Sequence, residues 1–272
     1  SSGGDAPGKE EWKMKRNRAA TFAALALAAV LTAALPGCSA GAAVLAGPNV
    51  SAPVRTAPEM EISAQLVQSL RDFTAQTGAE ALSQGKNVCY SPVSLYIALA
   101  LAGTGAAGET QEELYRLLGA EDTQALAEDV QLLQRTLYQE EKRCSVYLAN
   151  SLWMREGVDF YDSFTQRAAE QFYAESYTLD FAAPGAGKAV GRWVSDHTKG
   201  LLQPEISLKA DDILVLLNTV SFKANWVDAF PASATETADF TKQQGQTLAC
   251  PFLRAARSGE AVTAEGWNLA GL

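Results

Sequence analysis

The chain has 272 residues, 47% of them hydrophobic, and a formal net charge of −9 at pH 7. These values exclude a disordered or collagen-like chain and leave room for one large core or two small ones. The negative charge argues against nucleic acid as a partner, because such binding depends on clustered Lys and Arg. The sequence also predicts no disulfide framework, no metal site and no cofactor, since it has one histidine and four widely spaced cysteines: Cys38, Cys89, Cys144 and Cys250.

An export signal is predicted at residues 14–37. Met14 opens a basic stretch, an apolar run follows over residues 19–35, and a Leu-Pro-Gly sequence then leads into Cys38. This arrangement resembles a bacterial lipoprotein signal peptide. The resemblance implies that Cys38 is acylated and anchors an extracellular, cell-surface protein to the bacterial membrane. An ordinary cleaved signal peptide and a single transmembrane anchor are the alternatives, and all three predict export.

Two segments flank this signal. Residues 38–58 are rich in Ala, Gly and Pro without periodicity, which predicts a flexible tether. Residues 1–13 precede the expected initiator Met14 and contain no methionine, so we interpret them as translated upstream DNA. Residues 59–272 are then expected to form one continuous domain.

The first part of this domain, residues 59–137, is predicted to be mainly helical. An opening helix ends before Gly85, and a short strand is expected at residues 87–90. Ser91 is a good N-cap before Pro92, and residues 93–102 are apolar nearly all round, which predicts a buried helix. Residues 110–113 have the form of a capping box for a helix that a glycine closes. The apolar stripe of the opening helix is Ile62, Leu66, Leu70 and Phe73. The helix after the capping box has the stripe Leu114, Leu117 and Leu118 and closes at Gly119, and a further helix is marked by Leu126, Val130, Leu133 and Leu137.

The second part is predicted to alternate between strand and helix. Residues 145–154 have the pattern of a strand that is buried on both sides, and a second strand is expected at residues 177–181. Residues 213–222 are almost uninterruptedly apolar and predict a long central strand, and residues 235–272 predict short strands. The two intervening helices are marked by Phe164, Ala168 and Phe172, and by Val190, Trp193, Val194 and Leu201. The predicted fold class is α+β, with large sheets and several helices.

Several sequence blocks occur in a fixed order along this domain. A Ser-Pro-Val-Ser sequence at residues 91–94 starts the buried helix, and glycine-rich turns follow it. The other blocks are Trp-Val with a following Thr and Gly at residues 193–200, and Leu-Leu-Asn-Thr-Val-Ser-Phe-Lys at residues 216–223. Together, over residues 60–272, they resemble the serpin family of serine protease inhibitors. The sequence departs from that family at Gly191, where Asn is usual, and at Ala224, where Gly is usual.

The resemblance implies a multi-helix serpin fold with a large central sheet and a suicide mechanism of inhibition. In that mechanism an extracellular serine protease cuts an exposed reactive loop, which then inserts into the sheet as a strand. Ser94 and Asn218 are implied to belong to a polar cluster beneath the sheet where it must part. Trp226 is implied to lie near the place where insertion begins. The alternative for Ser94 and Asn218 is that they are ordinary hydrogen-bonded core groups.

The resemblance covers about the N-terminal two thirds of a serpin and runs out over residues 265–272. The reactive loop and its reactive-site bond are therefore expected to be absent from this chain, and the sheet to be incomplete. We expect the chain alone to be unable to inhibit. The alternative function is a non-inhibitory, serpin-fold surface lipoprotein that binds a protein partner.

Enzymatic alternatives are weaker. A Gly-x-Gly-x-x-Gly pattern at residues 103–108 follows a helix, whereas a dinucleotide site requires a strand before it. His197 has no second histidine and no nucleophile elbow to work with, so no hydrolase triad is predicted. The acidic pairs at residues 140–141 and 211–212 are adjacent in sequence and flank element ends, where solvated charge is usual. We therefore expect no enzyme activity.

Overall fold

A computed structural model describes residues 43–46, 62–83, 88–242, 244–255, 261–264 and 267–270, the first range and the last two as backbone only. The expected signal peptide, Cys38 and residues 1–13 lie outside these ranges. Within them, no helix is long and apolar enough to cross a membrane. The described side chains also include no group of three or more His, Cys, Asp or Glu arranged to hold a metal ion.

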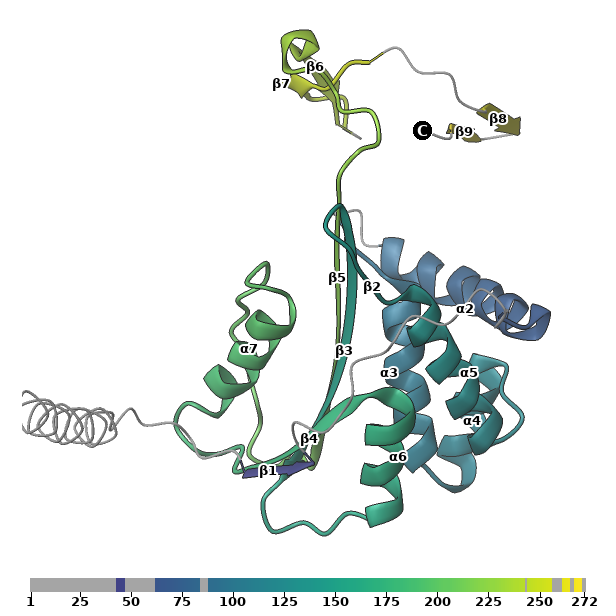
Figure 1. The fold of residues 1–272 in the computed structure, drawn as a ribbon, viewed down its shortest axis with the longest axis vertical. Coiled ribbons are helices and arrows are strands. Elements are labelled where there is room, and N and C mark those ends of the chain that lie inside the picture. Colours follow the sequence, from purple (N-terminus) through teal and green to yellow (C-terminus); the bar gives the residue numbers. More distant parts are fainter. Residues whose placement is uncertain are drawn as a thin grey trace, which may run out of the picture.

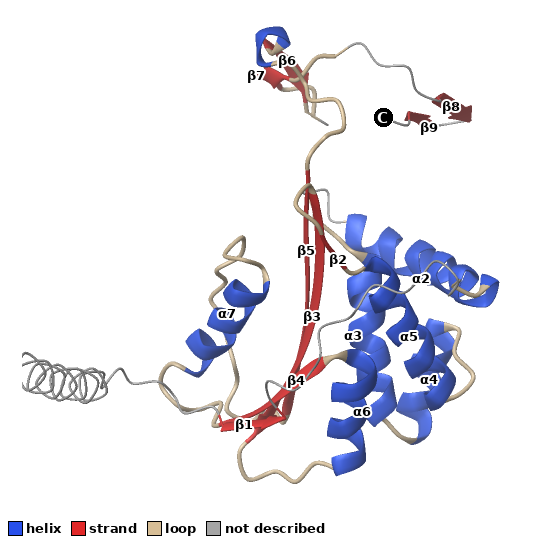
Figure 2. Ribbon diagram, viewed as in Figure 1, coloured by secondary structure: helices blue, strands red, loops and turns tan. Residues whose placement is uncertain are grey.

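The molecule is layered around one five-stranded sheet. Of the helices in the described part of the chain, five cover one face of the sheet and α7 (Ala186–His197) covers the other (Figures 1 and 2). The five covering helices are α2 (Ala64–Leu82), α3 (Pro92–Gly105), α4 (Gly108–Leu118), α5 (Thr123–Leu137) and α6 (Asp162–Phe172). The strands of the sheet are β1 (Ala43–Ala46), β2 (Gln139–Glu140), β3 (Cys144–Arg155), β4 (Ala174–Leu179) and β5 (Leu214–Ala224). This arrangement confirms the predicted α+β class.

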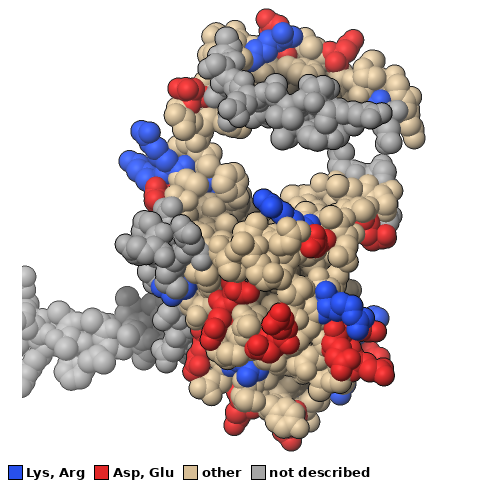
Figure 3. Space-filling view, turned by 90° about the vertical axis from the view of Figure 1, so that its right-hand side faces the viewer, with Lys and Arg blue, Asp and Glu red and all other residues tan. Residues whose placement is uncertain are grey.

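The helical layer presents an acidic outer surface. Figure 3 shows carboxylate groups gathered over these helices, with Lys and Arg between them. The exposed carboxylates include Glu112, Glu113, Glu121, Asp122 and Glu128. Such a surface repels the phosphates of nucleic acids.

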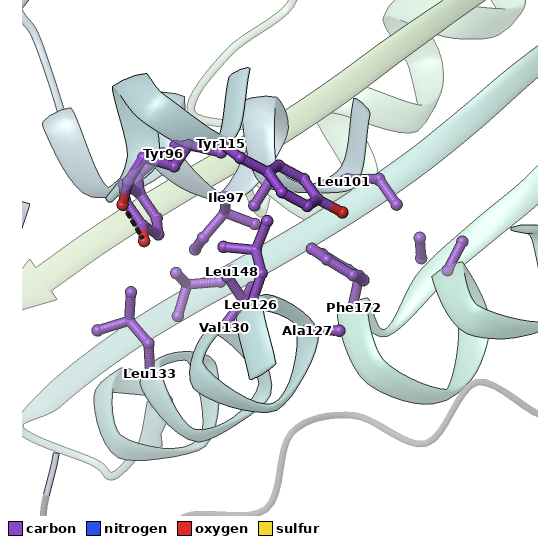
Figure 4. Close-up of a cluster of buried hydrophobic side chains, with 14 of the residues drawn as sticks. Tyr96, Ile97, Leu101, Tyr115, Leu126, Ala127, Val130, Leu133, Leu148 and Phe172 are labelled. Atoms are coloured by element: carbon purple, nitrogen blue, oxygen red, sulfur yellow. Dashed lines mark hydrogen bonds between the residues drawn. The ribbon is translucent and has the colours of Figure 1, made fainter. Parts of the chain in front are cut away.

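Helix α3 forms the centre of the main core. Ser91 caps it as predicted, since its Oγ accepts a hydrogen bond from the Ser94 amide at 3.3 Å, and Pro92 opens the first turn. Figure 4 shows side chains of α3 packed among those of α4, α5, α6 and β3. The Tyr96 hydroxyl donates to the carbonyl oxygen of Leu118 at 2.9 Å, which satisfies the hydrogen-bonding need of this buried phenol. Each large aliphatic side chain buried here stabilises the fold by about 1.5–3 kcal/mol.

Strand β3 organises the sheet. It runs parallel to β4 and antiparallel to β5, and its pairing with β5 extends from Cys144↔Ala224 to Met154↔Leu214. Alternate residues of β3 and β5 face the helical layer or α7, so both faces of these strands are covered. The prediction of a strand buried on both sides is confirmed.

The chain after β5 forms two hairpins and a short turn of 3₁₀ helix, Ala232–Ala234. The first hairpin pairs β6 (Glu236–Thr241) with β7 (Thr247–Phe252), and the second pairs β8 (Ala261–Ala264) with β9 (Trp267–Ala270). These four short strands confirm the prediction for residues 235–272.

Three local predictions are wrong. Residues 88–90 form no strand, and Asn87 lies outside the described residues; Tyr90 instead bonds through its hydroxyl to Thr77 of α2 at 2.5 Å. Helix α4 begins at Gly108, whose φ of +60° a glycine accepts without strain, so the expected capping box lies inside the helix and no side chain caps it. Leu201 is exposed because α7 ends at His197, after which Lys199 and Gly200 take positive φ values.

Two longer-range predictions also need correction. Ala43–Ala46, within the expected tether, is a strand, because the outer edge of β4 offers backbone groups with which it pairs. The rest of residues 38–58 lies outside the described ranges. Strand β5 was expected to be central, but among the described strands it pairs with β3 alone and lies at the edge of the sheet. Strand order depends on non-local pairing, which the apolar run at residues 213–222 does not encode.

Candidate functional site

The structure brings together the two residues predicted for the sheet-opening cluster. Ser94 lies in the first turn of α3 and Asn218 lies in the middle of β5, 124 residues apart in sequence. The Ser94 hydroxyl donates a hydrogen bond to the Asn218 side-chain oxygen Oδ1. Asn218 faces the helices because it shares the alternation of Leu216 and Val220, which pack against the main core.

Two further residues extend this cluster. Asn218 Nδ2 donates to Asn150 Oδ1 at 2.6 Å, directly across the β3–β5 pair. Asn150 Nδ2 in turn donates to Gln134 Oε1 at 2.7 Å and to the carbonyl oxygen of Phe172 at 2.6 Å. The polar cluster is therefore Ser94, Asn218, Asn150 and Gln134, a chain of hydrogen bonds from α3 through two strands to α5 and the end of α6.

Sequence reasoning missed Asn150 and Gln134. Both are almost fully excluded from solvent, with exposures of 1% and 0%. Each also breaks an apolar pattern: Asn150 stands between Leu148 and Leu152 on one face of β3, and Gln134 stands in the buried stripe of α5. A buried amide needs hydrogen-bond partners, so these interruptions were the available signal.

The cluster also caps the C-terminal end of α6. The last carbonyls of a helix lack partners inside it. Gln131 Nε2 donates to the Glu170 carbonyl oxygen at 2.9 Å, Gln134 Nε2 approaches that of Gln171 at 3.4 Å, and Asn150 bonds that of Phe172. Two members of the cluster, Gln134 and Asn150, therefore complete a helix terminus together with the neighbouring Gln131.

The direction of each hydrogen bond is fixed by its neighbour. Asn150 Nδ2 faces two oxygen acceptors, so its Oδ1 must face Asn218, which must then present its own oxygen to Ser94. All four members are uncharged amides or hydroxyls at ordinary pH. The nearby phenol of Tyr96 stays neutral as well, because burial raises its pKa to about 12. The cluster therefore keeps its arrangement over a wide pH range and joins β5 and β3 to three helices.

Beside the cluster, the outer edge of β5 has no strand paired to it among the described residues. The backbone N–H and C=O groups of every second residue point outward along such an edge and can accept another strand. Strand β5 has 11 residues. The arrangement thus places a long open strand edge next to a polar cluster that ties the sheet to its helices.

Trp226 lies apart from this cluster. It follows the end of β5, and from Asn218 to that end the strand extends about 20 Å. Its side chain is 55% exposed and packs edge-to-face on Phe230, with ring centroids 5.4 Å apart. The structure therefore places Trp226 at one end of the open edge, two residues beyond Ala224.

One departure from the serpin pattern has a structural cause. A Cβ atom at residue 191 would overlap the carbonyl oxygen of Pro204, and one at Gly187 would overlap that of Ile206. The chain after α7 therefore runs against the helix at a distance that only glycine permits. For Ala224, at the exposed end of β5, no cause is evident.

Comparisons with known proteins agree with this geometry. A family model described as "Serpin (serine protease inhibitor)" matches residues 68–266. The chain is 33% identical to the serpin Z2A of Oryza sativa subsp. japonica over 180 residues, covering 63% of this chain and 42% of that protein. It is 29% identical to neuroserpin of Gallus gallus over 179 residues, covering 64% and 44%.

Solved structures share the fold. The native stressed conformation of Arabidopsis AtSerpin1 matches with a TM-score of 0.69 and 23% identity, covering 78% of this chain and 56% of that one. The native state of tengpin, a thermophilic serpin, gives the same TM-score and identity, with coverages of 81% and 56%.

The chain spans about half the length of the curated relatives it matches. The family model nevertheless covers more than half of this chain and includes all four residues of the polar cluster. With the shared arrangement of helices and sheet, this match shows that the chain belongs to the serpin family of serine protease inhibitors.

Proposed function

We propose that this chain forms the N-terminal part of a serpin that inhibits serine proteases by a suicide mechanism. The protease serine attacks a peptide bond of the reactive loop, the amine half leaves, and the acyl half stays esterified to the enzyme. The loop then enters the sheet as an added strand and carries the protease with it, which distorts the protease active site before the ester is hydrolysed. In this proposal the reactive loop belongs to sequence outside this chain.

This proposal is carried by the polar cluster that ties the helices to β5, the long strand along which the loop would add. A strand added along its 11 residues forms roughly ten backbone hydrogen bonds, each contributing about 0.5–1.5 kcal/mol. The gross gain is therefore about 5–15 kcal/mol, before the entropy of ordering the loop is subtracted. Ordering a loop of 11 residues costs about 1–2 kcal/mol per residue, so the proposal also requires the inserted side chains to bury apolar surface.

The polar cluster has the role of a gate in this proposal. Ser94 and Asn218 join α3 to β5, so a sheet that shifts over the helices while it accepts a strand must break or rearrange this contact. Asn150 and Gln134 hold β3 to α5 in the same way. The gate therefore sets how readily the sheet moves.

The test is a gel assay of the complete protein with serine proteases of basic, aromatic and small-residue specificity. The proposal expects a complex that survives denaturing electrophoresis and is lost when the catalytic serine of the protease is blocked. A folded protein that is cleaved in an exposed loop and forms no stable complex with any of them would contradict inhibition. That outcome would favour the alternative of a non-inhibitory surface protein.

The proposal places the protein outside the cell, attached to the membrane through a lipid on Cys38. The Leu-Pro-Gly-Cys sequence that ends the apolar run at Cys38 supports it. Mass spectrometry of the N-terminal peptide from the native host should show an acylated Cys38 as the first residue. A soluble protein cleaved elsewhere, or one that retains residues 19–35, would contradict the anchor.

A further inference from the structure

Helix α7 is attached to the sheet by an apolar face and by one polar contact. Its buried residues Val190, Trp193 and Val194 pack with Trp153 of β3 and Leu179 of β4. This packing is on the face opposite to the other helices (Figure 1). The polar contact lies at the C-terminal end of α7 and involves a carboxylate of β4.

Glu175 of β4 bonds two residues that are one turn apart on α7. Its Oε2 accepts from Trp193 Nε1 at 2.6 Å, and its Oε1 lies 3.5 Å from His197 Nε2. The Tyr177 hydroxyl also donates to Oε2. The His197 and Glu175 side chains are 29% and 26% exposed, so the pair is partly shielded from water.

The two contacts of His197 favour a doubly protonated ring. His197 Nδ1 lies 2.9 Å from the Trp193 carbonyl oxygen, which can only accept, so Nδ1 must donate. In the neutral ring Nε2 then presents a lone pair to the Glu175 carboxylate. The other neutral tautomer turns a lone pair toward the Trp193 carbonyl instead. Only the imidazolium satisfies both oxygens.

The surroundings favour the same charge state. The imidazole stacks on the Trp193 indole with ring centroids 4.1 Å apart, an arrangement that stabilises a cation. His197 is the last residue of α7, where the helix dipole is negative. The adjacent Asp196 adds a second negative charge, whereas the nearby ammonium of Lys199 lies over the Tyr147 ring of β3, 4.8 Å from its centroid.

The strands and loop that pack against this face of α7 contribute apolar groups. They are Ala149, Trp153, Val215, Leu217, Ile206 and Leu208. Burial lowers the pKa of His197, but the hydrogen bond to Glu175, the contact with the Trp193 carbonyl and the charges of Glu175 and Asp196 outweigh it, so the pKa is raised above 6.5. Hydrogen bonding from His197, Tyr177 and Trp193 holds the pKa of Glu175 at about 2 despite its partial burial.

We propose that His197 and Glu175 form a proton-dependent clamp that holds α7 on the sheet, closed when the imidazole is protonated and loosened when it is neutral. A histidine whose pKa is higher in the docked state than in the undocked state stabilises docking fully below pH 6.5. That contribution is lost as the pH rises through the docked-state pKa. The clamp stands independently of the proposed inhibitory function.

The test is an NMR titration of the imidazole combined with hydrogen exchange of the α7 amides. His197 is the only histidine in the sequence, so its signals are unambiguous. We expect a pKa above 6.5 that falls toward the ordinary value in Glu175→Gln. We also expect α7 protection, corrected for intrinsic exchange, to fall by about two- to tenfold as the pH rises through that pKa, since one pKa unit is a factor of ten and partial exposure weakens the pair.

Matched variants separate the clamp from general charge effects. His197→Gln should remove the pH step in α7 protection, Asp196→Asn should keep most of it, and the amides of α5 on the opposite face should show none. The proposal is overturned if His197 titrates at or below 6.5 in the unaltered protein, or if the pH step persists in His197→Gln. The titration of the unaltered protein decides the matter even where a variant fails to fold.

Discussion

Replacing Asn150 by Leu tests the polar cluster most severely. The side chain is 1% exposed and makes three hydrogen bonds, to Asn218, Gln134 and Phe172. Leu keeps the branching of Asn at Cγ but leaves the Gln134 and Phe172 oxygens buried without a donor, and each such group costs about 1–3 kcal/mol. Asn218 is only partly buried and can turn its amide toward water. Allowing about 1 kcal/mol for the added apolar burial, we expect a loss of about 1–5 kcal/mol in the free energy of unfolding.

The assay is equilibrium urea unfolding followed by circular dichroism, with Thr219→Val as the matched control. Thr219 neighbours Asn218 on β5, but its hydroxyl is buried and has no hydrogen-bond partner in the structure. Removing that hydroxyl should leave stability unchanged or raise it. The reasoning is refuted if Asn150→Leu costs less than about 1 kcal/mol, or if Thr219→Val costs as much as Asn150→Leu.

Three further predictions concern single residues. Gly119→Ala should lower the free energy of unfolding by at least about 1 kcal/mol more than Gly157→Ala. Both glycines have a positive φ, but a Cβ at residue 119 would also lie 2.5 Å from the Oγ of Ser69, whereas one at residue 157 would meet nothing. Equal losses in urea unfolding would contradict this. Glu175→Gln should lower the free energy of unfolding by about 1 kcal/mol at pH 6, and this difference should vanish as the pH approaches 2. A carboxyl with a lowered pKa stabilises the fold above its ordinary pKa of 4.5 and loses that effect as the pH falls through about 2. A difference that persists at pH 2 in acid unfolding would contradict this. Ser94→Ala in the complete protein should speed loop insertion, whereas Ser83→Ala at the exposed end of α2 should not. The rate is measured by stopped-flow fluorescence with a protease, and equal rates in both variants would contradict the gate.

The sequence predicted most helices because their signals are local. Apolar stripes at helical spacing identified α2, α5 and α6, and the Ser91 cap with Pro92 identified the start of α3. The capping-box pattern failed at α4 because the preceding glycine turn let the helix begin at Gly108 instead. Local signals therefore located the helices better than they located the ends of the helices.

The polar cluster could be predicted only in part. The resemblance to serpins indicated Ser94 and Asn218, and the structure joins them directly. Asn150 could not be paired with Asn218 beforehand, because that contact depends on the register between β3 and β5. Glu175 and His197 lie 22 residues apart on different elements, so the sequence showed only a histidine near a helix end.

The edge position of β5 is the largest difference between expectation and structure. Its apolar run correctly predicted a long strand, and the structure covers both of its faces, since Leu216 packs with the main core and Leu217 with α7. Which strands lie beside it is decided by the rest of the fold. The pairing of β5 with β3 alone among the described strands was therefore visible only in the structure.

The thermal unfolding of the complete protein before and after proteolytic cleavage of its reactive loop tests most directly whether this sheet accepts another strand. If the loop inserts, the cleaved form gains roughly ten backbone hydrogen bonds and should unfold at least about 10 °C higher than the intact form. A cleaved form that unfolds at the same temperature or lower would contradict the mechanism.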